Sequence, residues 1–147
     1  MMNNNHIYYF GYASNLDIET LKGRLPAEPN LMGIGLLENH EFQFSFPNPD
    51  GSARANIHAK EGGKVFGLVF QISASAVDYF LNSEPGYDFI PKEILVGGAL
   101  ITAYTFQSKI RREGLTPSKE YIDTIVRGGQ TQDIPSWYLE EVISKSI

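Results

Sequence analysis

The stretch YYFGYASNLD, residues 8–17, changes character between its two ends. Its aromatic first part predicts a buried strand over residues 7–10. Residues 11–15 are mostly small or polar. From Asp17 on, apolar residues recur at helical spacing, and we expect a helix over residues 18–25 with Asp17 as its N-cap. The stretch therefore predicts a tight turn from a strand into a helix.

Two interpretations of this turn are open. Its backbone N–H groups would point towards the start of the helix and form a nest, which suits an anion or a developing oxyanion. Alternatively, the turn uses small residues for steric reasons alone. The local pattern is compatible with both.

The composition excludes several classes of protein. A chain of 147 residues fits one domain, here residues 1–147, and 42% hydrophobic and 20% charged residues are typical of a folded one. The net charge of −5 disfavours nucleic acids and anionic membranes as partners, because both favour a basic face. The absence of cysteine excludes disulfides, cysteine-ligated metals and a cysteine nucleophile.

The sequence shows no export or membrane signal. The start, MMNNNHIYYF, lacks both the basic and the apolar part of a signal peptide, and Asn3–Asn5 are expected to be a frayed start. The longest apolar-rich stretch, residues 94–106, is too short to span a bilayer, and Gly97 and Gly98 interrupt it. We therefore expect a cytoplasmic protein.

Alternating and apolar stretches predict about six or seven strands. After the first, the expected strands cover residues 31–37, 42–46, 54–59, 65–72 and 92–106. Two polar clusters separate them: PNPDGS (47–52) is a predicted turn, and EGGK (61–64) a predicted hairpin connection.

Three further helices are predicted. Ser73 or Ser75 can cap a short helix around residues 76–81. A second starts at Thr116 and Pro117 and ends at Gly128 and Gly129, and the last runs from residues 133–135 to the C-terminus. The strands come in consecutive runs. This favours an α+β fold with a mostly antiparallel sheet or small β-barrel.

The sequence offers one candidate acid–base group and no metal site. The three histidines, His6, His40 and His58, lack the spacing of a helical metal pair. Glu84, in SEPGYD (83–88), follows an apolar helix and precedes Tyr87, surroundings in which a carboxylate can act as a general base. The alternative is an exposed loop acid.

Taken together, these segments resemble the γ-glutamylcyclotransferase-like family, which includes γ-glutamylamine cyclotransferases and AIG2-like proteins. The family signature Y-F-x-Y-G-S-N-L reads YFGYASNL at residues 9–16, with Ala13 in place of a glycine. Residues 51–73 are similar to the family's strand pair. Residues 116–142 are similar to its last two helices. The resemblance covers nearly the whole chain.

The resemblance implies a small β-barrel with flanking helices, a pocket at one end and the cleavage of a γ-glutamyl amide. The α-amine of the substrate would attack its own γ-carbonyl, so that 5-oxoproline leaves together with an amine or amino acid. No metal or cofactor is implied. Three substrate classes are open: γ-glutamyl amino acids, γ-glutamyl amines including isopeptide-linked lysine, and a γ-glutamyl-protected metabolite. The alternative is a binding module that holds such a molecule without turnover.

The resemblance also assigns roles to residues. It places the catalytic acid–base at Glu84, although Pro85 stands where the family commonly has glycine. The implied substrate-binding residues are Tyr9, Phe10, Gly11, Tyr12, Ala13, Ser14, Asn15 and Tyr138. For Tyr138 a place in the core is equally compatible with its helix, and Arg54 is either a ligand for a substrate carboxylate or a solvated strand arginine. If position 13 requires a positive φ, alanine is strained there. The oligomeric state is not predicted.

Overall fold

The computed structural model of the chain describes residues 6–147, so the expected frayed start at Asn3–Asn5 lies outside the described residues. The elements in chain order are β1 (His6–Gly11), the 3-10 turn η1 (Ser14–Leu16), α1 (Ile18–Arg24), β2 (Asn30–Pro47), β3 (Ala53–Ser73), α2 (Ala76–Ser83), β4 (Asp88–Val96), β5 (Ala99–Gln107), α3 (Lys119–Thr131) and α4 (Ser136–Ser144).

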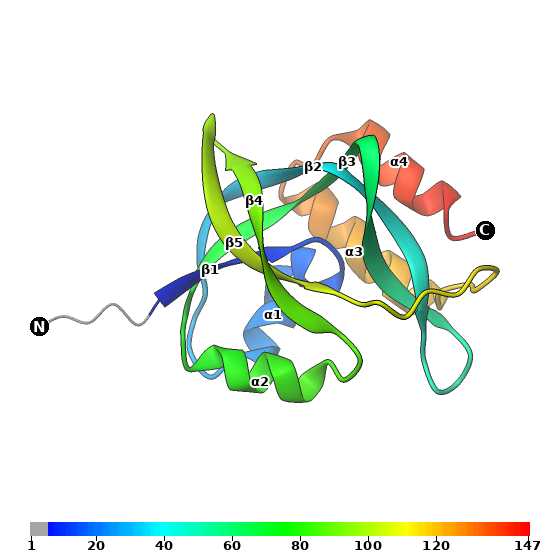
Figure 1. Cartoon of the computed structure of the whole chain (residues 1–147), viewed down its shortest axis with the longest axis horizontal. Coiled ribbons are helices and arrows are strands. Elements are labelled where there is room, and N and C mark those ends of the chain that lie inside the picture. Colours follow the sequence, from blue (N-terminus) through cyan, green and yellow to red (C-terminus); the bar gives the residue numbers. More distant parts are fainter. Residues whose placement is uncertain (1–5) are drawn as a thin grey trace, which may run out of the picture.

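Five strands in the described chain form a closed barrel in the order β1-β3-β2-β4-β5 (Figure 1). Neighbouring strands are antiparallel except β1 and β5, which run parallel and pair at Tyr9 and Tyr104. This parallel pair closes the barrel. The predicted class, an α+β fold with a small, mostly antiparallel barrel and flanking helices, is confirmed.

The long strands β2 and β3 correct the predicted number of strands. The segments 31–37 and 42–46 both belong to β2, and 54–59 and 65–72 both belong to β3. The EGGK stretch is therefore not a hairpin connection. The pairing passes from Glu38–Lys64 to His40–Ala59, so that residues 60–63 stand opposite Asn39 alone. Such an irregularity bends a strand without ending it.

The predicted strand over residues 92–106 is in fact a hairpin. Strands β4 and β5 pair along their whole length, and the turn between them consists of Gly97 and Gly98. Both glycines have a positive φ, 56° and 83°. This conformation suits the tight turns whose twist matches that of the flanking strands.

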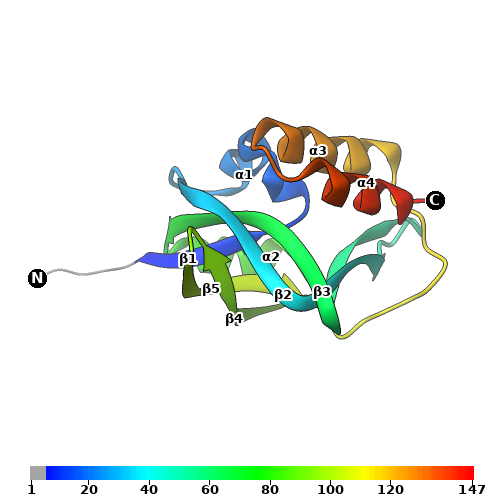
Figure 2. The ribbon, with the colours of Figure 1, turned by 90° about the horizontal axis from the view of Figure 1, so that it is seen from above.

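Helices α1, α3 and α4 lie together on one side of the barrel (Figure 2). Helix α3 begins at Lys119, where the Ser118 side chain accepts a hydrogen bond from the Tyr121 amide, and it continues through Gly128 and Gly129. The prediction that this glycine pair ends the helix is wrong. A Cβ atom on Gly128 would lie 2.3 Å from the Asp17 nitrogen, so α3 packs directly on the backbone that follows the first turn.

The other predicted helix limits differ less. Helix α1 ends at Arg24, one residue earlier than expected, and Ser75 is the residue before α2. Helix α4 begins after Pro135 and ends at Ser144, short of the C-terminus. None of the helices within residues 6–147 is long and apolar enough to cross a membrane.

An aromatic cluster joins α2 to the barrel. The ring centroids of Tyr9 and Phe80 are 4.8 Å apart, and those of Phe89 and Phe106 are 4.9 Å apart. All four side chains are buried or half-buried. Because Phe80 is held in this cluster, the end of α2 lies beside the turn that follows β1.

Candidate active site

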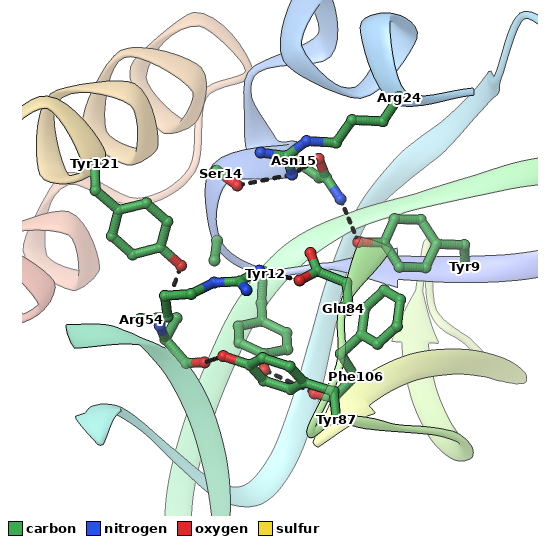
Figure 3. A pocket seen from close by; sticks show the side chains of 12 residues that line it. Tyr9, Tyr12, Ser14, Asn15, Arg24, Arg54, Glu84, Tyr87, Phe106 and Tyr121 are labelled. Carbon is green, nitrogen blue, oxygen red and sulfur yellow. Dashed lines mark hydrogen bonds and ion pairs between the residues drawn. The ribbon is translucent and has the colours of Figure 1, made fainter. Parts of the chain in front are cut away.

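A small cavity of about 40 Å³ lies where the turn after β1, strand β3 and the end of α2 meet (Figure 3). Its walls combine two arginines, one carboxylate and four tyrosines. The lining residues are Tyr9, Tyr12, Ala13, Ser14, Asn15, Arg24, Arg54, Ala55, Glu84, Tyr87, Phe106 and Tyr121.

The turn after β1 forms one wall of the cavity. Its own hydrogen bonds use the amides of Leu16 and Asp17, whereas the amides of Ser14 and Asn15 have no backbone partner among residues 6–147. Ala13 has a φ of −128°, so position 13 does not require a left-handed conformation and alanine fits there.

A chain of side-chain hydrogen bonds fixes this turn. The side-chain Nδ2 of Asn15 donates to Tyr9 Oη over 2.7 Å. Arg24 Nη1 donates to Asn15 Oδ1 over 2.8 Å and to Ser14 Oγ over 3.0 Å. A Cβ atom on Gly11 would lie 3.2 Å from both the Tyr9 ring and Asn15 Cβ. The small residue at position 11 therefore makes room for the turn's own side chains.

Glu84, the residue that follows α2, forms the opposite wall. It is 9% exposed, and its amide still donates to the Phe80 carbonyl over 3.1 Å. Gly86, with a φ of 94°, then turns the chain back. A Cβ atom there would lie 2.7 Å from the Phe46 ring. The segment Glu84–Tyr87 thus brings both a carboxylate and a phenol to the cavity.

Glu84 forms an ion pair with Arg54 of β3. The Arg54 guanidinium lies 5.2 Å from the centre of the Tyr87 ring and 6.0 Å from that of Phe46. Two phenols hold the backbone of Ala55, the residue after Arg54. Tyr87 Oη donates to the Ala55 carbonyl, and the Ala55 backbone amide donates to Tyr121 Oη over 3.1 Å.

Burial keeps the tyrosines of the cavity neutral. It raises the pKa of Tyr9, Tyr12, Tyr87 and Tyr121 above the ordinary value. For Arg54, burial lowers the pKa, but the charge of Glu84 and the hydrogen bond to it outweigh this effect and raise the pKa. At neutral pH the phenols are therefore uncharged and Arg54 is cationic.

The structure brings Glu84 and five predicted binding residues to one cavity, but not the other three. Phe10 is buried in the core, and Gly11 does not line the cavity. Tyr138, in α4, is 2% exposed and packs its ring 5.2 Å from that of Phe66. Tyr138 therefore does not line this cavity, although the resemblance places it at the site. Its hydroxyl makes no hydrogen bond of standard geometry among the described residues and lies near the Phe66 backbone.

Sequence reasoning missed four of the lining side chains that face Glu84 or the turn. Arg24, Tyr87, Phe106 and Tyr121 come from four different segments. Tyr87 lies in the SEPGYD stretch that contains Glu84, and Tyr121 lies in the helical segment that resembles the family. Both residues could therefore have been proposed from the segments in which they lie. Within residues 6–147, no three histidine, aspartate or glutamate side chains are grouped so as to hold a metal ion.

Known structures with this architecture identify the fold. A crystal structure of an uncharacterized human protein matches with a TM-score of 0.84 at 24% identity, over 94% of this chain and 86% of that one. A γ-glutamyl cyclotransferase matches with a TM-score of 0.83 at 23% identity, over 92% and 85%. The chain has the γ-glutamylcyclotransferase-like fold.

A more distant structure extends the comparison. A yeast γ-glutamyl cyclotransferase specific to glutathione matches with a TM-score of 0.71 at 11% identity, over 97% of this chain and 96% of that one. No protein-family model and no curated protein sequence matches this chain. The fold is thus shared over nearly all of the chain, whereas few residues are identical.

Proposed function

We propose that this chain belongs to the γ-glutamylcyclotransferase-like family and cleaves a γ-glutamyl amide, releasing 5-oxoproline. The observation that carries the proposal is the position of Glu84. This largely buried carboxylate faces the Tyr9–Asn15 turn across a cavity, in a fold shared with γ-glutamyl cyclotransferases.

The reaction needs one group that can take and return a proton. The substrate's α-ammonium gives a proton to Glu84, and the free amine attacks the γ-carbonyl of the same molecule to close a five-membered ring. Glu84 passes this proton to the leaving nitrogen as the C–N bond breaks. The ring nitrogen gives up its second proton through Glu84 to the departing amine, so that a neutral lactam and an ammonium remain. Because the nucleophile is part of the substrate, much of the cost of bringing the reactants together is already met.

The turn supplies donors for the negative charge that develops on the γ-carbonyl oxygen. The amides of Ser14 and Asn15, which have no backbone partner in the described chain, are suited to this role. Arg24 holds the two side chains of the same residues in place. Donors fixed before the reaction lower its barrier, because they need not reorient as charge develops.

The proposal includes no metal, cofactor, nucleic acid or membrane partner, and it keeps the expected cytoplasmic location. A second candidate function is the binding of a γ-glutamyl compound without turnover. The pairing of Glu84 with Arg54 favours it, because the carboxylate is already engaged by a cation in this structure.

A set of γ-glutamyl amino acids and amines separates the two functions. Purified protein is incubated with each compound in the presence of a strong chelator, and 5-oxoproline is measured by mass spectrometry. We expect its release from at least one compound. Binding that leaves every compound intact would instead establish the binding module, and restoration of activity by a divalent ion would contradict the metal-free mechanism.

A further inference from the structure

Two arginines reach the cavity from different sides of Glu84 (Figure 3). Arg24 comes from α1, and its Nη1 already donates to Ser14 and Asn15. Arg54 comes from β3, and within residues 6–147 its guanidinium donates to Glu84 alone. A guanidinium has five N–H donors. Arg54 therefore has N–H donors left for a further acceptor, whereas Arg24 is hydrogen-bonded to the turn after β1.

Arg54 also stands nearer to solvent than the carboxylate it contacts. Its side chain is 26% exposed, against 11% for Glu84. The cavity, about 40 Å³, has room for a few water molecules and is smaller than a γ-glutamyl amide. With the glutamyl group at the turn and its amide at Glu84, a leaving group on the more exposed side of Glu84 lies beside Arg54.

The surroundings of Arg54 orient its guanidinium for an anion. The rings of Phe46 and Tyr87 stack with centroids 4.5 Å apart, and the guanidinium lies near both. A shift in the β2–β3 register between Phe44 and Phe46 sets Phe46 opposite Arg54. Aromatic faces hold the plane of a guanidinium and leave its edge free for the two oxygens of a carboxylate.

We propose that Arg54 determines substrate specificity by binding a carboxylate on the leaving group. The inference rests on the proposed function, because it takes Glu84 as the group beside the scissile amide. An uncharged leaving group offers Arg54 no acceptor and must share the cavity with a half-buried cation. Among the three substrate classes, this selects γ-glutamyl amino acids over γ-glutamyl amines.

Two substrates that differ by one carboxylate test the inference. In γ-glutamyl-alanine the amide nitrogen bears an ethyl group with a carboxylate, and in γ-glutamyl-ethylamide it bears the ethyl group alone. A hydrogen bond to a charged group predicts that the wild type prefers γ-glutamyl-alanine in kcat/KM by about 10- to 100-fold, mainly through KM. Arg54→Gln should bring this ratio to about one, because it removes the charge-assisted contact.

Two further variants control for charge and shape. Arg111→Gln makes the same change of charge on an exposed side chain outside the cavity, and it should keep the wild-type ratio. Arg54→Lys keeps the charge but loses the forked donors, and its ratio should lie between those of the wild type and Arg54→Gln. If Arg54→Gln does not fold, Arg54→Lys carries the test and must lower the ratio.

The outcomes separate this inference from the proposed function. Release of 5-oxoproline with a wild-type ratio near one, or with an unchanged ratio in Arg54→Gln, overturns the inference alone. If neither compound yields 5-oxoproline, the proposed function fails for these two compounds. Calorimetric titration of each compound into the wild type and into Arg54→Gln then tests the role of Arg54 in binding. A preference for γ-glutamyl-alanine that Arg54→Gln removes supports the role of Arg54, and equal affinities overturn it.

Discussion

At the scale of single residues, the volume of the side chain at position 13 limits the cavity. Ala13 lines the cavity beside Ser14 and has an ordinary, negative φ. Its φ therefore does not call for a glycine, and its small side chain leaves space in the cavity.

Ala13→Val should weaken substrate binding more than it weakens folding. The branched side chain would reach into the cavity, so we expect a higher KM with a nearly unchanged melting temperature. Steady-state kinetics and thermal melting measure the two effects. Ala13→Gly is the companion: it should keep KM and lose about 0.5–1 kcal/mol of stability through backbone freedom. A normal KM in Ala13→Val would mean that the turn has no role in binding.

A variant of Tyr138 tests a residue that the resemblance places at the site but that lies in the core of the structure and outside the cavity lining. Its hydroxyl is buried without a partner among residues 6–147. Tyr138→Phe removes that hydroxyl and keeps the ring, so we expect unchanged kcat/KM and equal or higher stability. A clear fall in activity at unchanged stability would restore the sequence-based assignment of Tyr138 to the substrate.

At the scale of elements, the contact between α3 and the chain after η1 holds the turn in place. A Cβ atom on Gly128 would lie within 2.6 Å of backbone atoms of Leu16 and Asp17. On Gly129, by contrast, the added atom would meet the Leu139 side chain, which can move. An added methyl group would thus meet fixed backbone atoms at Gly128 but a movable side chain at Gly129.

Gly128→Ala should therefore destabilise the protein more than Gly129→Ala. Both changes raise helix propensity equally, so the difference isolates the backbone contact. Overpacking costs about 1–3 kcal/mol, and we expect Gly128→Ala to show this loss in urea unfolding and to lower activity as well, because the turn is displaced. Equal stabilities of the two variants would show that α3 does not hold the turn.

The elements also show how far sequence patterns predict this fold. The strand-to-helix turn and the α+β class followed from local signals that depend on neighbouring residues, whereas the choice of Glu84 came from the family resemblance. The limits of β2 and β3 did not, because residues 60–63 look like a hairpin connection while the β2–β3 pairing continues on either side of them. Whether a strand ends there depends on its partner strand and not on its own sequence.

The glycine pairs and the site illustrate the same limit. Gly97–Gly98 makes a turn and Gly128–Gly129 lies inside a helix, although both pairs look like chain breakers. Arg24 and Tyr121 reach the cavity through packing between distant elements. Conversely, Tyr138 shares its sequence segment with Tyr121 but lies on a helix that packs elsewhere. Such placements depend on tertiary contacts that one local pattern does not encode.

At the scale of the whole molecule, buried phenols make stability depend on alkaline pH. Burial raises the pKa of five tyrosines, Tyr9, Tyr12, Tyr87, Tyr121 and Tyr138, above the ordinary value of 10.0. Above that pH the unfolded chain releases protons that the folded chain retains. The contribution of these groups is thus complete below about pH 10 and is lost as the pH rises further.

The free energy of unfolding should therefore change little between pH 8 and 9 as far as these groups are concerned, and fall above about pH 10. Urea unfolding at a series of pH values measures the slope, and phenolate absorbance shows when the tyrosines ionise. Tyr138→Phe, which lacks one of the five groups, should show a shallower fall. Stability that stays constant through pH 11, with early phenolate absorbance, would contradict the burial of these hydroxyls.

The central claim for the molecule is that Glu84 moves the proton during ring closure. Glu84→Gln keeps the shape of the side chain but cannot accept a proton, and the measurement is kcat for 5-oxoproline release. Loss of a general acid–base predicts a fall of about 10²–10⁴-fold, with a near-native melting temperature. Asp88→Asn is the matched control, an exposed acid four residues on and outside the cavity, and it should retain wild-type kcat. If Glu84→Gln turns over like the wild type, or if Asp88→Asn suffers the same loss, Glu84 is not the catalytic group.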